Sequence, residues 1–452
     1  MSNRQYDVGH EIDSRRIGAK QWMLFVLCAL VILFDGFDIQ TVSYTAPFLS
    51  KHLGVALSSF GFIFASGLAG LTVGSIAIGP IADRLGRRKL LILFTLIFGV
   101  FTLLTLTADS ETALVIFRFM AGVGLGGGIP NALALCAEYT PTRARATAIA
   151  IIVSATPLGA VVGGLVAGSL IEAFGWQIVF WIGGVAPIIV AVMLVKWLPE
   201  SIRFMVVSGR DNGEIADVMT HMLPDFKYQA GGKFVLGQQQ NQKAGSVSLL
   251  FMNKMGNRTL SLWVTNFSMF LLTFLISSWL PSILKLAGFP LQQSVFALVG
   301  YQLTGVVGSA VLGRLGDKLG TPRVLSVVFI ICVFAVAYLG HPGNGYFTIL
   351  SLMAIAGFCI QGGISTLYGF AASIYPTAVR VTGIGWASAT GRFGAIFGPL
   401  VGGAMLSHGW SMQQMFIAAA IPAIVCVLGL MNLARLVRRD APVFVADVPA
   451  AH

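Results

Sequence analysis

Charged residues are scarce in this chain of 452 residues, which has 18 Asp and Glu and 29 Lys and Arg, together 10% of the sequence. A soluble domain carries charge on about a quarter of its residues, so this scarcity excludes an ordinary soluble protein. Hydrophobic residues make up 56% of the chain, and the mean hydropathy is +0.83. The shortage of charge and the excess of apolar residues predict an all-α integral membrane protein.

Cysteine and histidine are also sparse. The five cysteines lie inside apolar stretches without metal-ligand spacing, and the six histidines lie in loops, in tails or at the ends of these stretches. We therefore expect no disulfide, no metal site and no cofactor. The apolar stretches contain no nucleophile–base constellation, which argues against an enzyme. The segment Met1–Lys20 is polar and lacks the apolar core of a signal peptide, so we expect no cleavable leader.

Long apolar runs fill the rest of the chain. A membrane-spanning helix needs about 20 mostly apolar residues, and twelve such runs are separated by short polar or Gly/Pro-marked turns. We predict helices over residues 21–46, 57–82, 89–108, 112–138, 146–171, 176–197, 259–286, 293–315, 322–340, 346–373, 381–407 and 413–436.

The positions of the basic residues explain the net charge of +11. If the N-terminus is cytoplasmic, all but four of the 29 Lys and Arg residues fall in cytoplasmic segments; Lys51 and Lys285 lie outside, and Arg118 and Arg392 lie within spans. This asymmetry is the positive-inside pattern, and it predicts that both termini are cytoplasmic. The charge therefore reflects topology, and we expect no nucleic-acid partner.

The chain is internally duplicated. Gly79–Gly86 reappears 234 residues later as Gly313–Gly320, and Gly122 matches Gly357 at an offset of 235. A duplicated array of six and six helices is typical of parallel-repeat secondary transporters, whose substrate site lies at the midplane between pseudo-symmetric halves. We expect a cytoplasmic tail at 1–20, a six-helix half at 21–197, a cytoplasmic linker at 198–257, a second six-helix half at 258–436 and a tail at 437–452.

Two carboxylates lie inside the first apolar run. Asp35 and Asp38 are three residues apart, so on a helix they leave from neighbouring positions on one face. Carboxylates at membrane depth normally face a protein interior or a watery cavity, where they relay protons or pair with a cation. The alternative is a boundary pair that marks the end of the span, but apolar sequence continues on both sides. We predict a proton-coupling role for both.

Residues that recur in both halves are expected to be structural, whereas charges found in one half alone are candidates for specific chemical roles. All five intramembrane charges are unmatched, and Asp38 for example maps onto Leu272. Arg392 lies about 16 Å into its span and Arg118 about 9 Å into its own, roughly level with Asp38. We expect Arg392 to bind a substrate carboxylate through its planar fork, the alternative being an ion pair with a carboxylate of the protein. Arg118 is also a candidate substrate-binding residue, and it is the better candidate partner for the carboxylates of the first span.

The loop after the second run carries a recognisable motif. Gly79-x-x-x-Asp83-Arg84-x-Gly86-Arg87-Arg88 resembles the cytoplasmic loop signature of the major facilitator superfamily. Asp83 can pair with a cation or a helix N-terminus, and its repeat mate Asp317 supports such a role. Arg84, Arg87 and Arg88 are predicted to gate as well as to anchor topology, with topology alone as the alternative.

Within the superfamily, Asp35-Gly36-Phe37-Asp38 is similar to the aromatic acid:proton symporter family. Arg118 with the glycines of the fourth run, Trp279-Leu280-Pro281, and Gly391-Arg392-Phe393-Gly394 extend the resemblance over nearly the whole chain. The resemblance implies proton-driven transport of benzoate-, 4-hydroxybenzoate- or protocatechuate-type acids. No histidine lies deep in a span, which leaves carboxylates as the proton carriers.

Further polar residues complete the predicted site. Glu138 closes the fourth span, where we favour a gate salt bridge over a proton site, and Asn131 lies nearly on the same face. Other polar or aromatic residues are candidates to stack on and hydrogen-bond an aromatic acid, with packing as an equal alternative for each: Tyr44, Tyr301, Gln302, Gln361, Tyr368 and Trp386.

The sequence thus predicts a proton-coupled importer of a small aromatic carboxylate in the cell inner (cytoplasmic) membrane. It is expected to be monomeric, to serve aromatic hydrocarbon catabolism, and to have the acid, protons and the lipid bilayer as partners. Alternatives are an exporter or a symporter of another organic anion. A receptor on a transporter scaffold would need a larger cytoplasmic domain than these tails and linker provide.

Overall fold

The computed structural model describes residues 5–229, 231–237, 247–252, 255–376 and 379–439. Within these ranges, the side chains of Gly79, Pro80, Asp83, Val381 and Arg439 are not described. The chain forms two compact units, one of Met1–Val55 with Ser66–Asn241 and one of Ala56–Ala65 with Gln242–His452.

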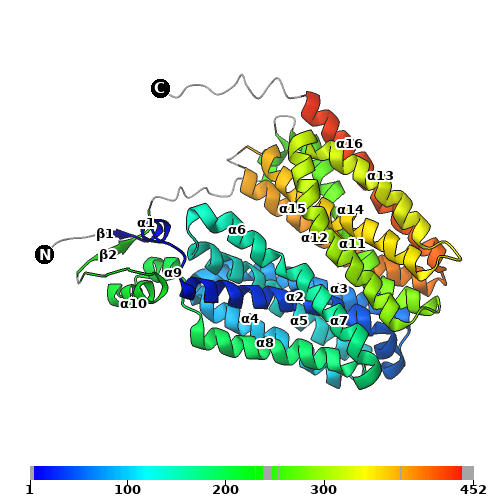
Figure 1. The fold of residues 1–452 in the computed structure, drawn as a ribbon, viewed down its shortest axis with the longest axis horizontal. Coiled ribbons are helices and arrows are strands. Elements are labelled where there is room, and N and C mark those ends of the chain that lie inside the picture. Colours follow the sequence, from blue (N-terminus) through cyan, green and yellow to red (C-terminus); the bar gives the residue numbers. More distant parts are fainter. Residues whose placement is uncertain (1–4, 230, 238–246, 253–254, 377–378, 440–452) are drawn as a thin grey trace. The chain divides into compact units, whose positions relative to one another are not determined.

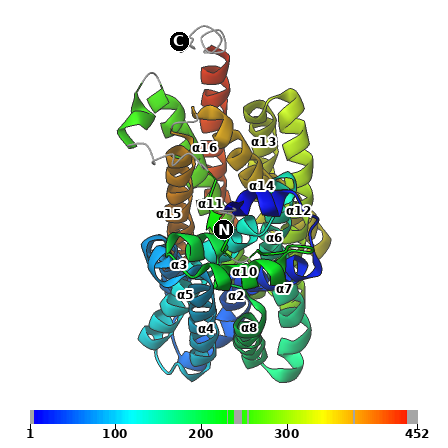
Figure 2. The ribbon, with the colours of Figure 1, turned by 90° about the vertical axis from the view of Figure 1, so that its left-hand side faces the viewer.

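The first unit is built on seven long helices (Figure 1). They are α2 (Ala19–Leu53), α3 (Phe60–Leu85, whose first residues belong to the second unit), α4 (Arg87–Leu104), α5 (Glu111–Glu138), α6 (Thr142–Val153), α7 (Ala155–Phe174) and α8 (Gln177–Trp197). Shorter elements are β1 (Gln5–Asp7), α1 (Val8–Asp13), η2 (Thr105–Thr107), α9 (Ile202–Val207), α10 (Asn212–Met222) and β2 (Lys233–Val235). In Figure 2, α2, α4, α5 and α8 lie side by side.

The second unit has six long helices. They are α11 (Met255–Leu286), α12 (Leu291–Leu319), α13 (Thr321–Leu339), α14 (Tyr346–Ile374), α15 (Arg380–Ser407) and α16 (Met412–Arg439), preceded by η3 (Val247–Phe251) and with η1 (Leu57–Ser59) beside α15. Eleven helical stretches of the described chain are long and apolar enough to cross a membrane. The glycine-rich α15, 28 residues long, is the twelfth long stretch. The predicted all-α membrane fold is confirmed.

Two predicted helices differ from the observed ones. The first was expected over 21–46, but α2 continues through Pro47 and ends at Leu53, where Gly54 has a φ of 65° and its N–H bonds to Ser50. Left-handed glycine is a common helix stop, whereas a proline inside a long buried helix does not end it. The fifth span, expected over 146–171, consists of α6 and α7, which meet at Ser154.

Helix packing inside each unit follows the same pairing. In the first unit α2 packs against α7 and α8, and in the second α11 packs against α15 and α16. A Cβ added to Gly159 would lie 1.7 Å from the Leu33 carbonyl oxygen, and one added to Gly394 would lie 2.1 Å from that of Phe267. These residues are related by the offsets of 234 and 235 found in the sequence. The duplication therefore extends to individual backbone contacts.

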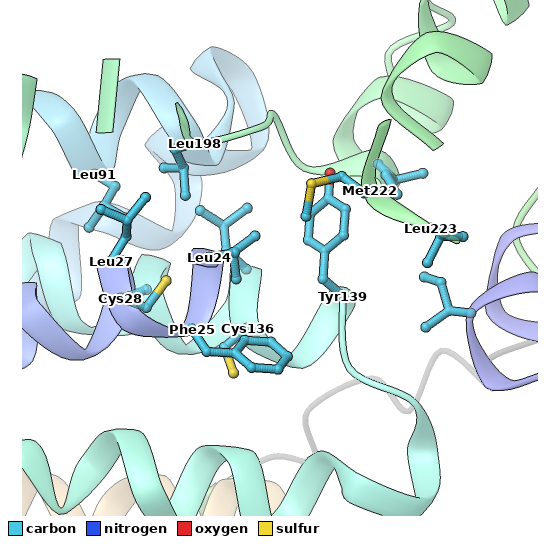
Figure 3. Packing of buried hydrophobic residues seen from close by; sticks show 14 of the residues in the cluster. Leu24, Phe25, Leu27, Cys28, Leu91, Cys136, Tyr139, Leu198, Met222 and Leu223 are labelled. Carbon is cyan, nitrogen blue, oxygen red and sulfur yellow. The ribbon is translucent and has the colours of Figure 1, made fainter. Parts of the chain in front are cut away.

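A hydrophobic cluster closes the end of the first unit that we expect to be cytoplasmic. Leu24 and Leu27 of α2, Cys136 near the end of α5, and Met222 of α10 are fully or almost fully buried together (Figure 3). Tyr139 is buried beside them, and its hydroxyl donates to the Glu200 carbonyl at 2.5 Å. Burial, together with the nearby carboxylates of Glu138 and Glu200, raises the pKa of Tyr139 well above its usual value.

The N-terminal segment and the linker fold together, which the sequence did not predict. β1 pairs in parallel with β2, so that Tyr6 lies opposite Phe234 (Figure 1). At the other end of this segment, Asp13 accepts from the Thr142 N–H at 2.6 Å and from its hydroxyl at 2.5 Å. Burial of the Asp13 carboxyl raises its pKa, but these bonds and the charges of Arg145 and Arg143 outweigh it and lower the pKa below 3.8.

Candidate functional site

A buried ion pair joins α2 to α5. Arg118 donates from Nη1 to Asp38 Oδ1 at 3.1 Å and from Nη2 to Asp38 Oδ2. Thr102 of α4 donates its hydroxyl to Asp38 Oδ1 at 3.2 Å. The exposed fraction is 0% for Asp38 and Thr102 and 4% for Arg118. Three hydrogen bonds from two helices thus hold the carboxylate away from solvent.

Gly36 sets the direction in which these carboxylates leave α2. Gly36 lies against α7, where an added Cβ would be 1.8 Å from the Thr156 carbonyl oxygen. Successive helical residues are about 100° apart, so Asp35 and Asp38 are separated by about 60° and both lie away from Gly36. The close contact with α7 therefore turns the carboxylates toward α4 and α5.

Asp35 borders a small cavity beside the ion pair. Its exposed fraction is 2%, and the cavity, about 10 Å³ in volume, is also lined by Thr95 of α4 and by Gly124 and Gly128 of α5. That volume is close to the minimum for a single water molecule. Gly124 packs against the backbone of α4, and a Cβ added to Gly128 would meet nothing closer than 3.5 Å, so the absence of a side chain at Gly128 leaves space beside the carboxylate.

The pairing of Asp38 with Arg118 has a chemical consequence. A bidentate guanidinium–carboxylate contact requires an ionised carboxylate, because only then do both oxygens accept. Protonation of Asp38 removes the negative charge and leaves a buried guanidinium without its counter-ion, which is costly. The position of the proton and the position of Arg118 are therefore linked.

The structure brings Asp38 and Arg118 together, as expected from their similar depth. The other first-half candidates are placed differently. Asn131 is buried and donates to the Gly127 carbonyl of its own helix at 3.1 Å. Tyr44 is fully buried and donates to the Ala160 carbonyl of α7 at 3.0 Å, which favours the packing alternative for this residue.

A second polar network lies at the other end of α5. Glu138 forms an ion pair with Arg87 of α4, and accepts from the Ser201 hydroxyl at 2.5 Å. Glu200 accepts from the Arg88 N–H at 3.0 Å. The salt bridge predicted at Glu138 is present, with both partners inside the first unit. Its role as a gate stays a prediction.

The remaining loop candidates are exposed or outside the described residues. Arg84 at the end of α3 and Asp317 at the end of α12 are exposed. The side chain of Asp83 lies outside the described residues, so its predicted gating contact stays a prediction.

In the second unit, Arg392 is half-buried near the middle of α15. The preceding residue, Gly391, faces α11, where an added Cβ would lie 2.8 Å from Asn266 Nδ2 and 2.9 Å from the Phe270 ring. The Asn266 amide donates to the Ala387 carbonyl, one turn before Gly391. The arginine thus follows a point where α11 and α15 are in direct contact.

Polar and aromatic side chains occur nearby on α12 and α14. Gln361 Nε2 donates to Gln302 Oε1 at 2.9 Å. The Tyr368 ring meets the Phe270 ring edge-on at 6.4 Å, so Phe270 connects Tyr368 to Gly391. Tyr301 is fully buried.

Among the ring contacts of the described residues, Trp386 of α15 contacts a tryptophan of α11 and none of these polar and aromatic residues. It is 42% exposed and stacks on Trp263 of α11 at 5.7 Å between ring centroids. This pairing favours a packing or membrane-interface role over substrate contact for Trp386.

Three residues that contact candidate residues were not predicted: Thr102 in the first unit, and Asn266 and Phe270 in the second. The repeat contains a signal for the first two, because Thr102 maps onto Val336 and Asn266 onto Ile32. Both positions are thus polar in one half alone, as the five intramembrane charges are. For Phe270 there is no such signal, since phenylalanine is abundant in membrane spans.

Comparison with known proteins identifies the family. The model of the Major Facilitator Superfamily matches residues 28–368 and 262–451. The chain is 34% identical to the 4-hydroxybenzoate transporter PcaK of Pseudomonas putida, over 97% of this chain and 98% of that protein. It is also 34% identical to a gallate transporter of Pseudomonas putida, over 94% of both chains.

A solved structure shares the fold. The chain superposes on a bacterial homologue of the human lysosomal transporter Spinster with a TM-score of 0.73 and 16% sequence identity, covering 94% of this chain and 98% of that one. The twelve long helical stretches, the internal repeat and these matches agree. This chain is a multi-pass membrane transporter, not an enzyme, and it belongs to the aromatic acid transporters of the major facilitator superfamily.

Proposed function

We propose that this protein is a proton-coupled symporter that imports a small aromatic carboxylate of the hydroxybenzoate type. The observation that carries the proposal is the fully buried Asp38–Arg118 pair. Buried ionisable groups at membrane depth are rare and usually belong to a substrate pathway or a proton relay. In this pair a single proton decides whether the two side chains attract.

The proposed coupling follows from the effect of this proton on the ion pair. With Asp38 ionised, Arg118 is held; with Asp38 protonated, the guanidinium is released and a different arrangement of the helices becomes accessible. Asp35, three residues earlier and beside a water-sized cavity, is suited to pass the proton to or from Asp38. Alternating access would then proceed only when a proton and the acid are bound together or are both absent.

The proposed substrate class rests on the second unit and on the relatives. Arg392 offers a planar fork that suits a carboxylate. Phe270 and Tyr368 provide aromatic surface close to the Gly391 position, and aromatic rings pack well against each other. Relatives named for 4-hydroxybenzoate and gallate transport both act on hydroxylated benzoates. We therefore favour a monocyclic hydroxybenzoate.

The proposed setting is the cell inner membrane, with both termini cytoplasmic. The distribution of Lys and Arg supports this orientation. We further propose that 21–197 and 258–436 act as the two halves of a monomeric transporter, connected by the linker at 198–257.

The test is uptake of radiolabelled 4-hydroxybenzoate into proteoliposomes that contain the purified protein. An inward proton gradient should drive accumulation, and an uncoupler should abolish it. Benzamide, which lacks the carboxylate, should not compete. Accumulation unaffected by the uncoupler would refute proton coupling, and extrusion of preloaded acid by an inward proton gradient would identify an exporter instead.

A further inference from the structure

Three buried threonines lie on α4 or directly after it, at residues 95, 102 and 105, and one of them is bonded differently from the other two. Thr95 donates to the Leu91 carbonyl at 2.7 Å, and Thr105 donates to the Phe101 carbonyl at 3.0 Å. Both bonds run four residues back along the helix, the usual partner for a threonine in a membrane helix. Thr102 instead donates to the Asp38 carboxylate.

The side chain of Thr102 is held in this orientation by packing. Its methyl group faces α8, where a Cβ added to Gly183 would lie 3.6 Å from Thr102 Cγ2. In a helix a threonine divides mainly between two χ1 rotamers, and its neighbours decide which one it takes. With the methyl group directed at Gly183, the hydroxyl is directed at α2.

A hydroxyl is suited to both protonation states of Asp38, because it is a donor and an acceptor at once. While Asp38 is ionised, Thr102 donates to Oδ1 alongside Arg118. When Asp38 is protonated, the new carboxyl O–H needs an acceptor, and Arg118 has none to offer. Thr102 can then accept that proton's hydrogen bond.

We propose that Thr102 is a positioning residue of the proton-coupling site, which keeps Asp38 hydrogen-bonded both with and without its proton. This inference rests on the proposed proton-coupled transport and adds a residue to it. Thr102 does not itself carry the proton. Its hydrogen bond to the ionised carboxylate is stronger than the one to the neutral carboxyl, so Thr102 favours the ionised form of Asp38 and promotes release of the proton.

The charged surroundings of Asp38 leave few other groups to take this role. Arg118 approaches from α5, and Asp35 lies three residues back on α2. The remaining charged side chains of α4 to α8 lie in the first or last turn of their helices. The nearest phenol, Tyr44, donates to Ala160 of α7, and the thiols Cys28 and Cys136 lie toward the start of α2 and the end of α5.

Thr102→Val is a well-matched test, because valine has the same shape without the hydroxyl and the equivalent position in the second half is Val336. Because the lost hydrogen bond is stronger to the carboxylate than to the neutral carboxyl, Asp38 should keep its proton to higher pH in the variant, by about one pH unit. In proteoliposomes, the pH midpoint of 4-hydroxybenzoate counterflow should rise by about one unit. Net proton-driven uptake should fall about tenfold relative to counterflow.

Control variants separate positioning from packing. Thr105→Val removes a similarly buried hydroxyl that bonds to the Phe101 carbonyl and not to Asp38, and it should keep the wild-type midpoint. Thr102→Ser keeps the hydroxyl and should also keep the midpoint, whereas Thr102→Ala should shift it. If Thr102→Val does not accumulate in the membrane, the Ala and Ser variants make the same comparison, since both lack the methyl group.

The outcomes distinguish this inference from the proposed function. Wild-type uptake that is not reduced by an uncoupler would refute proton coupling itself. Uncoupler-sensitive wild-type uptake, with the same midpoint and the same ratio of net uptake to counterflow in Thr102→Val and Thr102→Ala, would refute the role of Thr102 alone. A shift in Thr102→Ser as large as in Thr102→Ala would show that the methyl group, and not the hydroxyl, matters.

Discussion

Gly36 of α2 and Thr156 of α7 are in backbone contact, so close that a Cβ on residue 36 would lie 1.8 Å from the Thr156 carbonyl oxygen. The α2 helix therefore has no room for a side chain at residue 36. Since Gly36 lies between Asp35 and Asp38, the same contact that packs two helices also orients the two carboxylates.

Gly36→Ala should therefore separate α2 from α7 and destabilise the protein by roughly 1–3 kcal/mol or more, the usual cost of overpacking. We expect poor accumulation in the membrane and a lower Tm of the purified protein. Gly313→Ala is the matched control, because a Cβ there meets nothing within 4 Å. Equal Tm values for the two variants would contradict the proposed tight contact.

Asp38→Asn should abolish uphill uptake, because an amide cannot take up and release the proton. It also leaves Arg118 buried without its counter-ion, at a cost of about 3–5 kcal/mol. Combining it with Arg118→Gln should restore much of the stability but none of the proton-driven uptake. The measurements are Tm and uncoupler-sensitive accumulation, and uphill uptake by either variant at wild-type rates would exclude Asp38 as a proton carrier.

Asp35→Asn should abolish uphill uptake with a smaller effect on Tm than Asp38→Asn. Asp35 borders the small cavity, whereas Asp38 forms the bidentate ion pair with Arg118. Accumulation assays beside Tm measurements on the same preparations check both parts. Wild-type accumulation by Asp35→Asn would restrict proton coupling to Asp38.

Arg392→Lys should weaken binding of 4-hydroxybenzoate to the purified protein, because an ammonium keeps the charge but not the bidentate geometry. Loss of one charge-assisted bond is worth roughly 1.5–3 kcal/mol, which is about one to two decades in Kd. Calorimetric titration with the acid measures this, and benzamide serves as the uncharged control. Were Arg392→Ala to bind the acid as tightly as wild type, Arg118 would become the candidate for anion recognition.

Asp13→Asn should loosen the N-terminal segment from α6. The pKa of Asp13 in the folded protein is lowered, so its carboxylate contributes stability above the unfolded value of 3.8, and this contribution is lost as the pH falls through the folded value. Hydrogen exchange of residues 5–17 should therefore be faster in the variant, by a constant factor between pH 5 and 8. A difference that already shrinks between pH 8 and 5 would argue against this carboxylate as the cause.

Much of the fold follows from the sequence alone. Apolar runs of spanning length predict the helices, because a bilayer leaves the backbone no partner except itself. The offset of 234 to 235 residues predicts the recurring contacts of Gly159 and Gly394, since small residues permit close helix approach. The charges of Asp38 and Arg118 were identifiable from depth and from their absence in the other half.

The tertiary structure decided which of these groups meet. Sequence shows that Tyr44 and Thr102 are polar residues in apolar spans, but only packing shows that Tyr44 bonds to a carbonyl of α7 while Thr102 bonds to Asp38. The pairing of β1 with β2 joins segments more than 220 residues apart, and short polar stretches carry no periodicity that predicts such a contact. Local sequence sets the position and the burial of each helix. The choice of hydrogen-bond partner depends on how the helices are rotated against one another. Here that rotation is set by contacts such as the one between Gly36 and Thr156.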